Sequence, residues 1–131
     1  MSADVEAIAA EVSGGEVCQA ANDNSPGQVV VSGHKGAVEA AVVLATAKGA
    51  KRAVSLPVSA PFHCTLMAPA AQRMATALAD TNIRPPLVPV VANVTAKGIT
   101  EPSDIRRLLV DQITGVVRWR ESVLWMKEQG V

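Results

Sequence analysis

The segment "EVCQAANDNSPGQVVVSG", residues 16–33, contains two β-prone runs around a cluster of turn-forming residues. Residues 24–27, Asn-Ser-Pro-Gly, each favour a turn for a local reason: proline restricts φ, glycine permits positive φ, and Asn and Ser bond to nearby backbone. The runs on either side, 16–23 and 28–33, have the composition of strands. The segment therefore predicts two consecutive strands that pair as a hairpin.

Helical patterns flank this pair. Apolar residues recur at a spacing of three to four behind Ser2, a candidate cap, until Gly14-Gly15 ends the pattern. A second apolar stripe runs over 34–48, and residues 51–58 read as a third short strand. The predicted order is helix, strand, strand, helix, strand. One further strand in front would complete the β-α-β-β-α-β pattern, so residues 1–59 are predicted to be a ferredoxin-like small subdomain without its first strand.

The second half of the chain has a different pattern. A helix is predicted over 65–81, followed by "PLVPVVANV", residues 86–94, whose unbroken apolar run is typical of a strand buried on both faces. Ser103 is a candidate cap for the next helix, and a last helix is predicted near 119–129. The overall fold class is α/β, with a boundary near residue 59 and residues 60–131 forming part of a larger α/β subdomain.

Composition excludes several partners. The 131 residues carry no net charge, and one Phe and two Trp supply almost no aromatic surface, so neither a phosphate backbone nor stacked bases are expected ligands. No run is long and apolar enough for a membrane span, and no export signal opens the chain. A cytoplasmic protein is expected, with Cys18 and Cys64 as reduced thiols.

His63 is the first candidate for chemistry, because it follows Pro61 on a turn just ahead of a helical pattern. An imidazole can take up and return a proton near neutral pH, which suits a general base; a capping or surface histidine is the alternative. Cys64 is its neighbour, but adjacent side chains diverge, so a Cys–His pair is not expected and a buried, inert thiol is. The two Cys and two His lack the spacing of a metal site. No G-x-S-x-G elbow occurs in the chain.

Three asparagines are further candidates. Asn22 and Asn24 lie where the first strand meets its turn, and Asn93 lies at the end of the apolar run 86–94. Amides there could orient an acyl group, and ligands often meet the carboxyl ends of strands in open α/β sheets. Ordinary turn chemistry is the alternative for Asn22 and Asn24.

Three blocks in this order carry a resemblance: "NDNSPGQVVVSGHKGAVEAA", "AKGAKRAVSLPVSAPFHCTLMAPAAQRMA" and "PVVANVTAKGI". Together they resemble the malonyl-CoA:acyl carrier protein transacylases of fatty acid synthesis, and the same motifs recur in polyketide synthase acyltransferase domains. The resemblance implies a ferredoxin-like subdomain beside an α/β-hydrolase-like one. It also implies ping-pong transfer of malonyl from coenzyme A, through a serine ester, to the phosphopantetheine thiol of acyl carrier protein. No cofactor is implied.

The resemblance assigns roles to five positions. His63 matches the family's catalytic histidine, and Gln112 matches the residue whose main-chain carbonyl orients it. Phe62 matches an aromatic that favours malonyl over branched units by steric exclusion. Asn22, in preference to Asn24, matches an amide near the active site, and Asn93 a pocket-side residue.

The family's serine elbow and its malonyl-binding arginine have no match in these residues. The chain is therefore expected to be an inactive fragment, whose exposed truncated edges favour self-association. The alternatives are a non-catalytic module that binds acyl carrier protein or another partner, and a fragment of a polyketide synthase acyltransferase domain.

Overall fold

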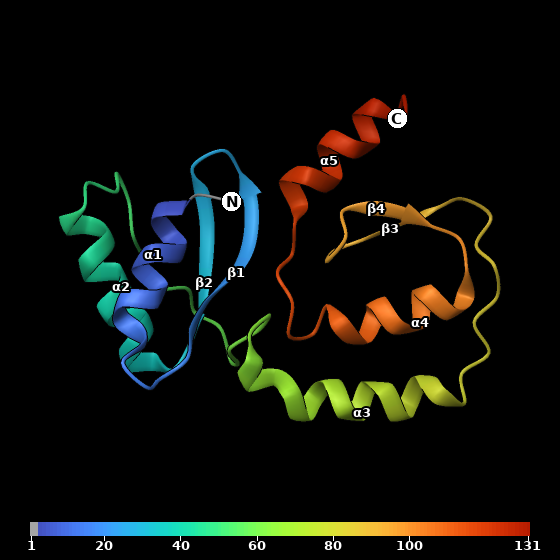
Figure 1. The fold of residues 1–131 in the computed structure, drawn as a ribbon, viewed down its shortest axis with the longest axis horizontal. Helices are drawn as coiled ribbons and strands as arrows, with labels where there is room; N and C mark the ends of the chain where they lie inside the picture. The colour runs from blue at the N-terminus through green and yellow to red at the C-terminus, as the bar shows by residue number, and fades with distance from the viewer. Residues whose placement is uncertain (1–2) are drawn as a thin grey trace.

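The computed structural model describes residues 3–131 as a mixed α/β fold (Figure 1). Each half of the chain contains one two-stranded antiparallel sheet. The elements in order are α1 Ala3–Ser13, β1 Cys18–Ser25, β2 Gln28–Gly33, α2 Lys35–Ala47, the 3₁₀ turn η1 Thr65–Met67, α3 Ala68–Ala79, β3 Val90–Ala92, β4 Lys97–Ile99, α4 Pro102–Asp111 and α5 Trp119–Glu128.

The predicted hairpin is present, with a tighter turn than expected. β1 continues through Asn24 to Ser25, which pairs with Gln28, so only Pro26 and Gly27 lie between the strands. Gly27 has φ 77°, a conformation that a side chain would strain, which explains a glycine at this point. Two register shifts interrupt the ladder, between Ala20 and Asn22 and between Asp23 and Ser25. Such bulges increase the twist of a strand.

Helices α1 and α2 pack against this hairpin and against each other (Figure 1). The helices predicted on either side of the hairpin are therefore confirmed; the proposed Ser2 cap lies outside the described residues. Small side chains at the contact allow the helices to approach closely. The buried cluster consists of Ile8, Ala9, Cys18, Ala37 and Ala41.

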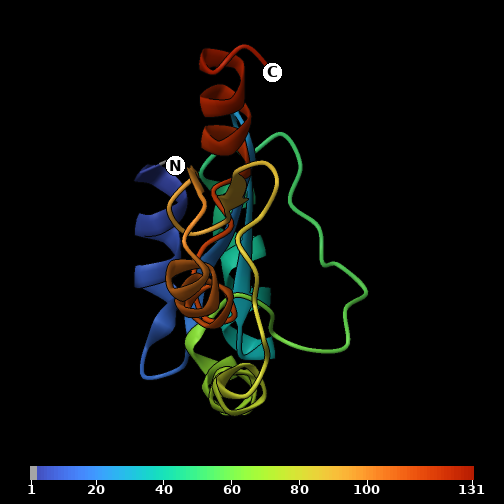
Figure 2. The ribbon, with the colours of Figure 1, turned by 90° about the vertical axis from the view of Figure 1, so that its right-hand side faces the viewer.

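The strand predicted over 51–58 is wrong. These residues form an exposed loop that extends away from the other elements, as Figure 2 shows in green. Pro57 has no N–H for a ladder, and the Val58 N–H donates locally to the Leu56 carbonyl, 2.9 Å away. These residues favour β structure, but no strand edge lies beside them, so they remain an extended loop.

The strand predicted over 86–94 is mostly wrong as well. Only β3, Val90–Ala92, joins a ladder, and its antiparallel partner is β4. Leu87 and Val88 are exposed, so the run is not buried on both faces in the described residues. Prolines at 85, 86 and 89 remove the N–H donors that a longer ladder needs.

The helices of the second half lie where they are predicted, and α5 begins at Trp119 as expected. The 65–81 pattern divides into η1 and α3, with Pro69 in the first turn of α3, where a missing N–H costs little. The helix after Ser103 begins earlier, at Pro102, with Glu101 at the cap position. α3 and α4 lie side by side (Figure 1).

Strand β1 connects the two halves of the chain. The Val117 N–H donates to the Ala21 carbonyl at 2.8 Å, and the Asp23 N–H donates to the Val117 carbonyl at 2.9 Å. These bonds form a parallel bridge between Asn22 and Val117. β1 therefore lies against the segment that leads into α5.

Candidate functional site

His63 has a backbone conformation that is uncommon among residues other than glycine. Its φ is 59°, in the left-handed region, where a non-glycine residue costs on the order of 1–3 kcal/mol and persists only when its surroundings hold it. Inside the turn, the Cys64 thiol donates to the Pro61 carbonyl at 3.1 Å, and the Met67 N–H donates to the Cys64 carbonyl at 3.0 Å. The turn thus presents the imidazole at the start of η1.

The ring of His63 is oriented by a main-chain carbonyl. Its Nδ1 lies 2.8 Å from the carbonyl oxygen of Gln112. A carbonyl only accepts, so Nδ1 must carry the proton and, in the neutral ring, Nε2 holds the free lone pair. His34 has the opposite arrangement, because its Nδ1 accepts the Val17 N–H at 2.8 Å and its proton must therefore be on Nε2.

The Gln112 carbonyl is free for this contact because of its place in α4. Gln112 is the C-cap of that helix, and the last carbonyls of a helix have no intrahelical donor. They also form the negative end of the helix dipole, which favours a positive charge nearby. The end of α4 can therefore orient the His63 ring and stabilise an imidazolium, as the carboxylate does in Ser-His-Asp triads.

Asn93 contacts Gln112 rather than His63. Its Nδ2 donates to Gln112 Oε1 at 3.4 Å, a long bond, and its carbonyl accepts the Arg118 N–H at 3.0 Å. The amide of Asn93 thus supports the residue whose carbonyl holds the imidazole. The sequence predicts Asn93 near the site but does not predict its contact with Gln112.

An open pocket of about 540 Å³ lies beside His63. Phe62 is on its wall and is 46% exposed. Arg73 also lines the pocket, and the sequence analysis does not single it out. The spacing indicates its position, because Ala70, Arg73 and Ala77 are three and four residues apart and so share one face of α3. The lining residues are Phe62, His63, Met67, Ala70, Arg73, Met74, Ala77, Gln112 and Ile113.

Asn22 and Asn24 do not line this pocket. Both are half-buried on β1, where Asn22 forms the bridge to Val117 and Asn24 lies in the second register shift of the hairpin. The role that the resemblance gives to Asn22 remains a prediction.

A buried ion pair lies between β1 and α5. Asp23, 2% exposed, accepts from Nε of Arg120 at 3.2 Å to each oxygen and from Nη2 at 2.8 Å. These hydrogen bonds hold the pKa of Asp23 below its ordinary value, and Asp23 raises the pKa of Arg120. The pair fixes α5 to the strand that carries Asn22.

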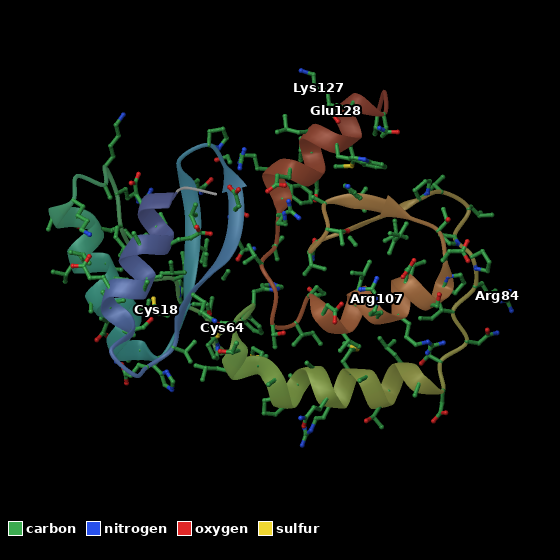
Figure 3. The ribbon with its side chains drawn as sticks, viewed as in Figure 1. Cys18, Cys64, Arg84, Arg107, Lys127 and Glu128 are labelled. Atoms are coloured by element: carbon green, nitrogen blue, oxygen red, sulfur yellow. The ribbon has the colours of Figure 1, made fainter. Side chains whose placement is uncertain are left out.

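Both thiols are buried and unpaired with each other, and Figure 3 labels them, with Cys64 close to where α3 begins. Burial raises the pKa of Cys18, and the neighbouring Cys64 adds to this shift. In residues 3–131 no cluster of three or more His, Cys, Asp or Glu could hold a metal ion.

The cysteines should therefore react slowly in the folded chain. We expect iodoacetamide to modify each at least about tenfold more slowly at neutral pH than after unfolding in urea, because the reagent needs an accessible thiolate. Mass spectrometry of timed samples measures both rates. Labelling of Cys64 in the folded chain at the unfolded rate would contradict an inert, buried thiol.

Comparison with solved structures indicates the class of protein. The chain superposes on an acyl-carrier-protein-S-malonyltransferase from Bartonella henselae with a TM-score of 0.93 and 53% identity, over 98% of this chain and 41% of that one. It also matches a malonyl-transacylase solved with a type II polyketide synthase acyl-carrier protein, with a TM-score of 0.94 and 45% identity, over 97% and 41% of the two chains. The fold of this chain is thus that of part of these transferases.

Sequence comparison finds relatives that share one name. The malonyl CoA-acyl carrier protein transacylase of Escherichia coli strain K12 is 50% identical over 121 residues, which are 92% of this chain and 39% of that protein. The Bacillus subtilis enzyme of the same name is 44% identical over 117 residues, 89% of this chain and 37% of that protein. The chain is homologous to part of the malonyl CoA-acyl carrier protein transacylases and spans about two fifths of their length. Comparison with models of protein families finds no match.

Proposed function

We propose that this chain supplies the general base of a malonyl CoA-acyl carrier protein transacylase. The observation that carries the proposal is the hydrogen bond from His63 Nδ1 to the Gln112 carbonyl, in a chain half identical to a transacylase of that name. This bond leaves Nε2 as the basic nitrogen, on a residue that lines a pocket. The nucleophile is a serine from the part of the family enzyme that has no counterpart here.

The chemistry has two halves. His63 Nε2 accepts the serine proton while the serine oxygen attacks the thioester carbonyl; the C–S bond breaks, and the imidazolium returns the proton to the coenzyme A thiolate. In the second half, Nε2 takes the proton of the carrier protein's thiol, and the sulfur attacks the carbonyl carbon of the serine ester. The ester C–O bond then breaks, and the imidazolium returns the proton to the leaving serine oxygen. The charge on the ring is transient, and the end of α4 stabilises it.

The finer assignments belong to the same proposal. Malonyl-CoA and phosphopantetheinylated acyl carrier protein are the substrates, and the relative solved with an acyl-carrier protein supports the second of these. Phe62 lies on the pocket wall, where its ring narrows the pocket and disfavours branched acyl units. The order of α1, β1, β2 and α2 is that of the inner four elements of a ferredoxin-like unit, which supports a small subdomain over 1–59. Residues 60–131 are then part of an α/β-hydrolase-like subdomain.

A soluble enzyme of the cytoplasm is proposed as well. In the described part of the chain, no helix is long and apolar enough to cross a bilayer. Self-association through exposed apolar surface is a further proposal, supported by exposed Leu87, Val88 and Leu124.

A chimaera tests the function. Residues of this chain replace the matching segment of the Escherichia coli relative, which keeps its own serine, and malonyl transfer from malonyl-CoA to the carrier protein is measured. We expect kcat/KM within about tenfold of the unaltered host enzyme, since half of the replaced residues are identical. A folded chimaera without transfer would contradict the proposal. If the separate 131-residue chain then bound the carrier protein, a non-catalytic binding module would be the better description.

A further inference from the structure

We propose that Gln19 is a positioning residue for His63: its side-chain oxygen, presented by β1, holds in place the turn that carries the histidine. The inference depends on the proposed function only for the role of His63 as the base. The contact itself, and the test below, concern the orientation of the ring.

The turn needs an external support. His63 is left-handed at φ 59°, and a non-glycine residue leaves that region unless its neighbours hold it. The bonds from Cys64 to Pro61 and from Met67 to Cys64 are local, so they define the shape of the turn and move with it. They do not set its place relative to α4, where the orienting carbonyl lies.

Two hydrogen bonds in the described part of the chain join residues 61–67 to other elements. One is the bond from His63 Nδ1 to the Gln112 carbonyl, 2.8 Å long. The other is from the Thr65 N–H to Gln19 Oε1, also 2.8 Å long, between residues 46 positions apart. The first orients the ring, and the second holds the backbone two residues later.

The Thr65 N–H has no acceptor inside its own helix. It opens η1, and the first N–H groups of a helical run lack intrahelical partners. Cys64, at the cap position, makes no side-chain cap hydrogen bond to it either. Gln19 supplies this cap from β1, where its backbone is paired with Ser32 of the neighbouring strand. The acceptor therefore stands on a paired strand, a firmer support than a loop.

The expected effect is local, because Gln19 and Thr65 are both exposed and water can replace their bond at little cost in overall stability. The position of the turn is more sensitive. A shift of the turn takes Nδ1 away from the Gln112 carbonyl, and a ring without that acceptor can place its proton on either nitrogen. Loss of Gln19 should therefore appear in the tautomer of His63 before it appears in the stability of the chain.

Gln19→Met in the 131-residue chain is the first test, because it keeps the length of the side chain and removes the acceptor. We expect the Thr65 amide to exchange about tenfold faster or more, and the ¹⁵N signals of the His63 ring to move from the Nδ1–H form to a mixture. His34, with the opposite tautomer, is an internal reference in the same spectrum. Gln19→Glu keeps an acceptor and should keep the parent's signals. Gln28→Met, at the far end of the same hairpin, is the matched control and should change neither readout.

Thr65→Pro removes the same bond from the donor side. Proline is tolerated at the first helical position, and Cys64, at φ −139° and ψ 172°, has the extended conformation that a residue before proline requires. In this background Gln19→Met should have no further effect on His63. An equal effect in both backgrounds, or unchanged His63 signals in Gln19→Met, would overturn the proposal. If Gln19→Met does not fold, Thr65→Pro alone must weaken the Nδ1–H form. These readouts do not require malonyl transfer, so an inactive chimaera would refute the proposed function and leave this inference standing.

Discussion

Replacing His63 in the chimaera should lower kcat/KM for malonyl transfer by about 10²–10⁴-fold, the usual contribution of a positioned general base. His63→Asn is the sharper variant. Asparagine tolerates the left-handed backbone of this turn better than most residues, and its amide cannot take up the serine proton. Alanine would remove the base and add backbone strain, so that a loss of activity would have two causes.

His34→Asn is the matched control. His34 is the only other histidine of the chain, it is exposed, and its ring bonds to the Val17 N–H rather than to a residue of the pocket. We expect this variant to keep the transfer rate within about threefold. Equal losses in both variants would indicate damage to folding, and an active His63→Asn chimaera would exclude His63 as the base.

His63→Gly provides a second test of the same residue. Glycine adopts φ 59° without strain, but the variant loses the hydrogen bond to Gln112 and gains backbone freedom when unfolded. We therefore expect its stability to stay within about 1 kcal/mol of the parent's while it remains inactive. Free imidazole in the buffer should restore part of the rate, since it can occupy the space of the missing ring. Thermal unfolding and transfer assays on one preparation separate stability from catalysis. Transfer by this variant at the parent's rate without added imidazole would exclude His63 as the base.

The second large effect is expected at the ion pair between Asp23 and Arg120. Arg120→Met should lower the free energy of unfolding by about 3 kcal/mol, near the lower end of what removing one partner of a buried pair costs. The reason is that Asp23, 2% exposed, loses its guanidinium, whereas the side chain of Arg120 is 30% exposed. Asp23→Asn should cost less, about 1–2 kcal/mol, because water can reach the remaining arginine.

The same pair predicts a loss of stability in acid. The pKa of Asp23 is lower in the folded chain than in the unfolded one, so the contribution of the pair is complete above the unfolded value. It is lost as the pH falls through the lowered folded value, below about pH 4. Urea unfolding between pH 7 and pH 3 measures this. Asp23→Asn should flatten the acid limb of the curve.

Arg107→Met is the control for this prediction. Arg107 pairs with Asp104 and Asp111, but all three side chains are about half exposed. Exposed pairs contribute little, so a change within about 0.5 kcal/mol is expected. If Arg107→Met and Arg120→Met lowered the free energy of unfolding equally, burial would not distinguish the two ion pairs.

Local pattern was a reliable guide where neighbours in sequence form the element. The hairpin at 16–33 and the helices around it follow from turn residues, caps and apolar spacing, all within a few positions of one another. The strands predicted at 51–58 and 86–94 are absent or mostly absent, because a strand depends on a partner that its own sequence does not specify. A strand needs a partner at its edge, and β-prone residues beside prolines do not supply one.

The candidate site divides in the same way. His63 could be singled out from its place after Pro61 and before a helix, and its link to Gln112 was expected only through the resemblance. The pocket position of Arg73 and the support that Asn93 gives to Gln112 were not predicted. Asn22, chosen by resemblance, lies on β1 away from the lining of the pocket.

By itself, the sequence determined the hairpin, the helices and a histidine on a turn, because each depends on interactions across a few residues. Only the tertiary structure decided which groups meet over long separations. Arg120 reaches Asp23 across 97 positions, and Gln19 reaches Thr65 across 46. Closing such distances depends on the packing of whole elements, so no local pattern marks either partner. The histidine could thus be read from the sequence, and the contacts that orient it belong to the fold.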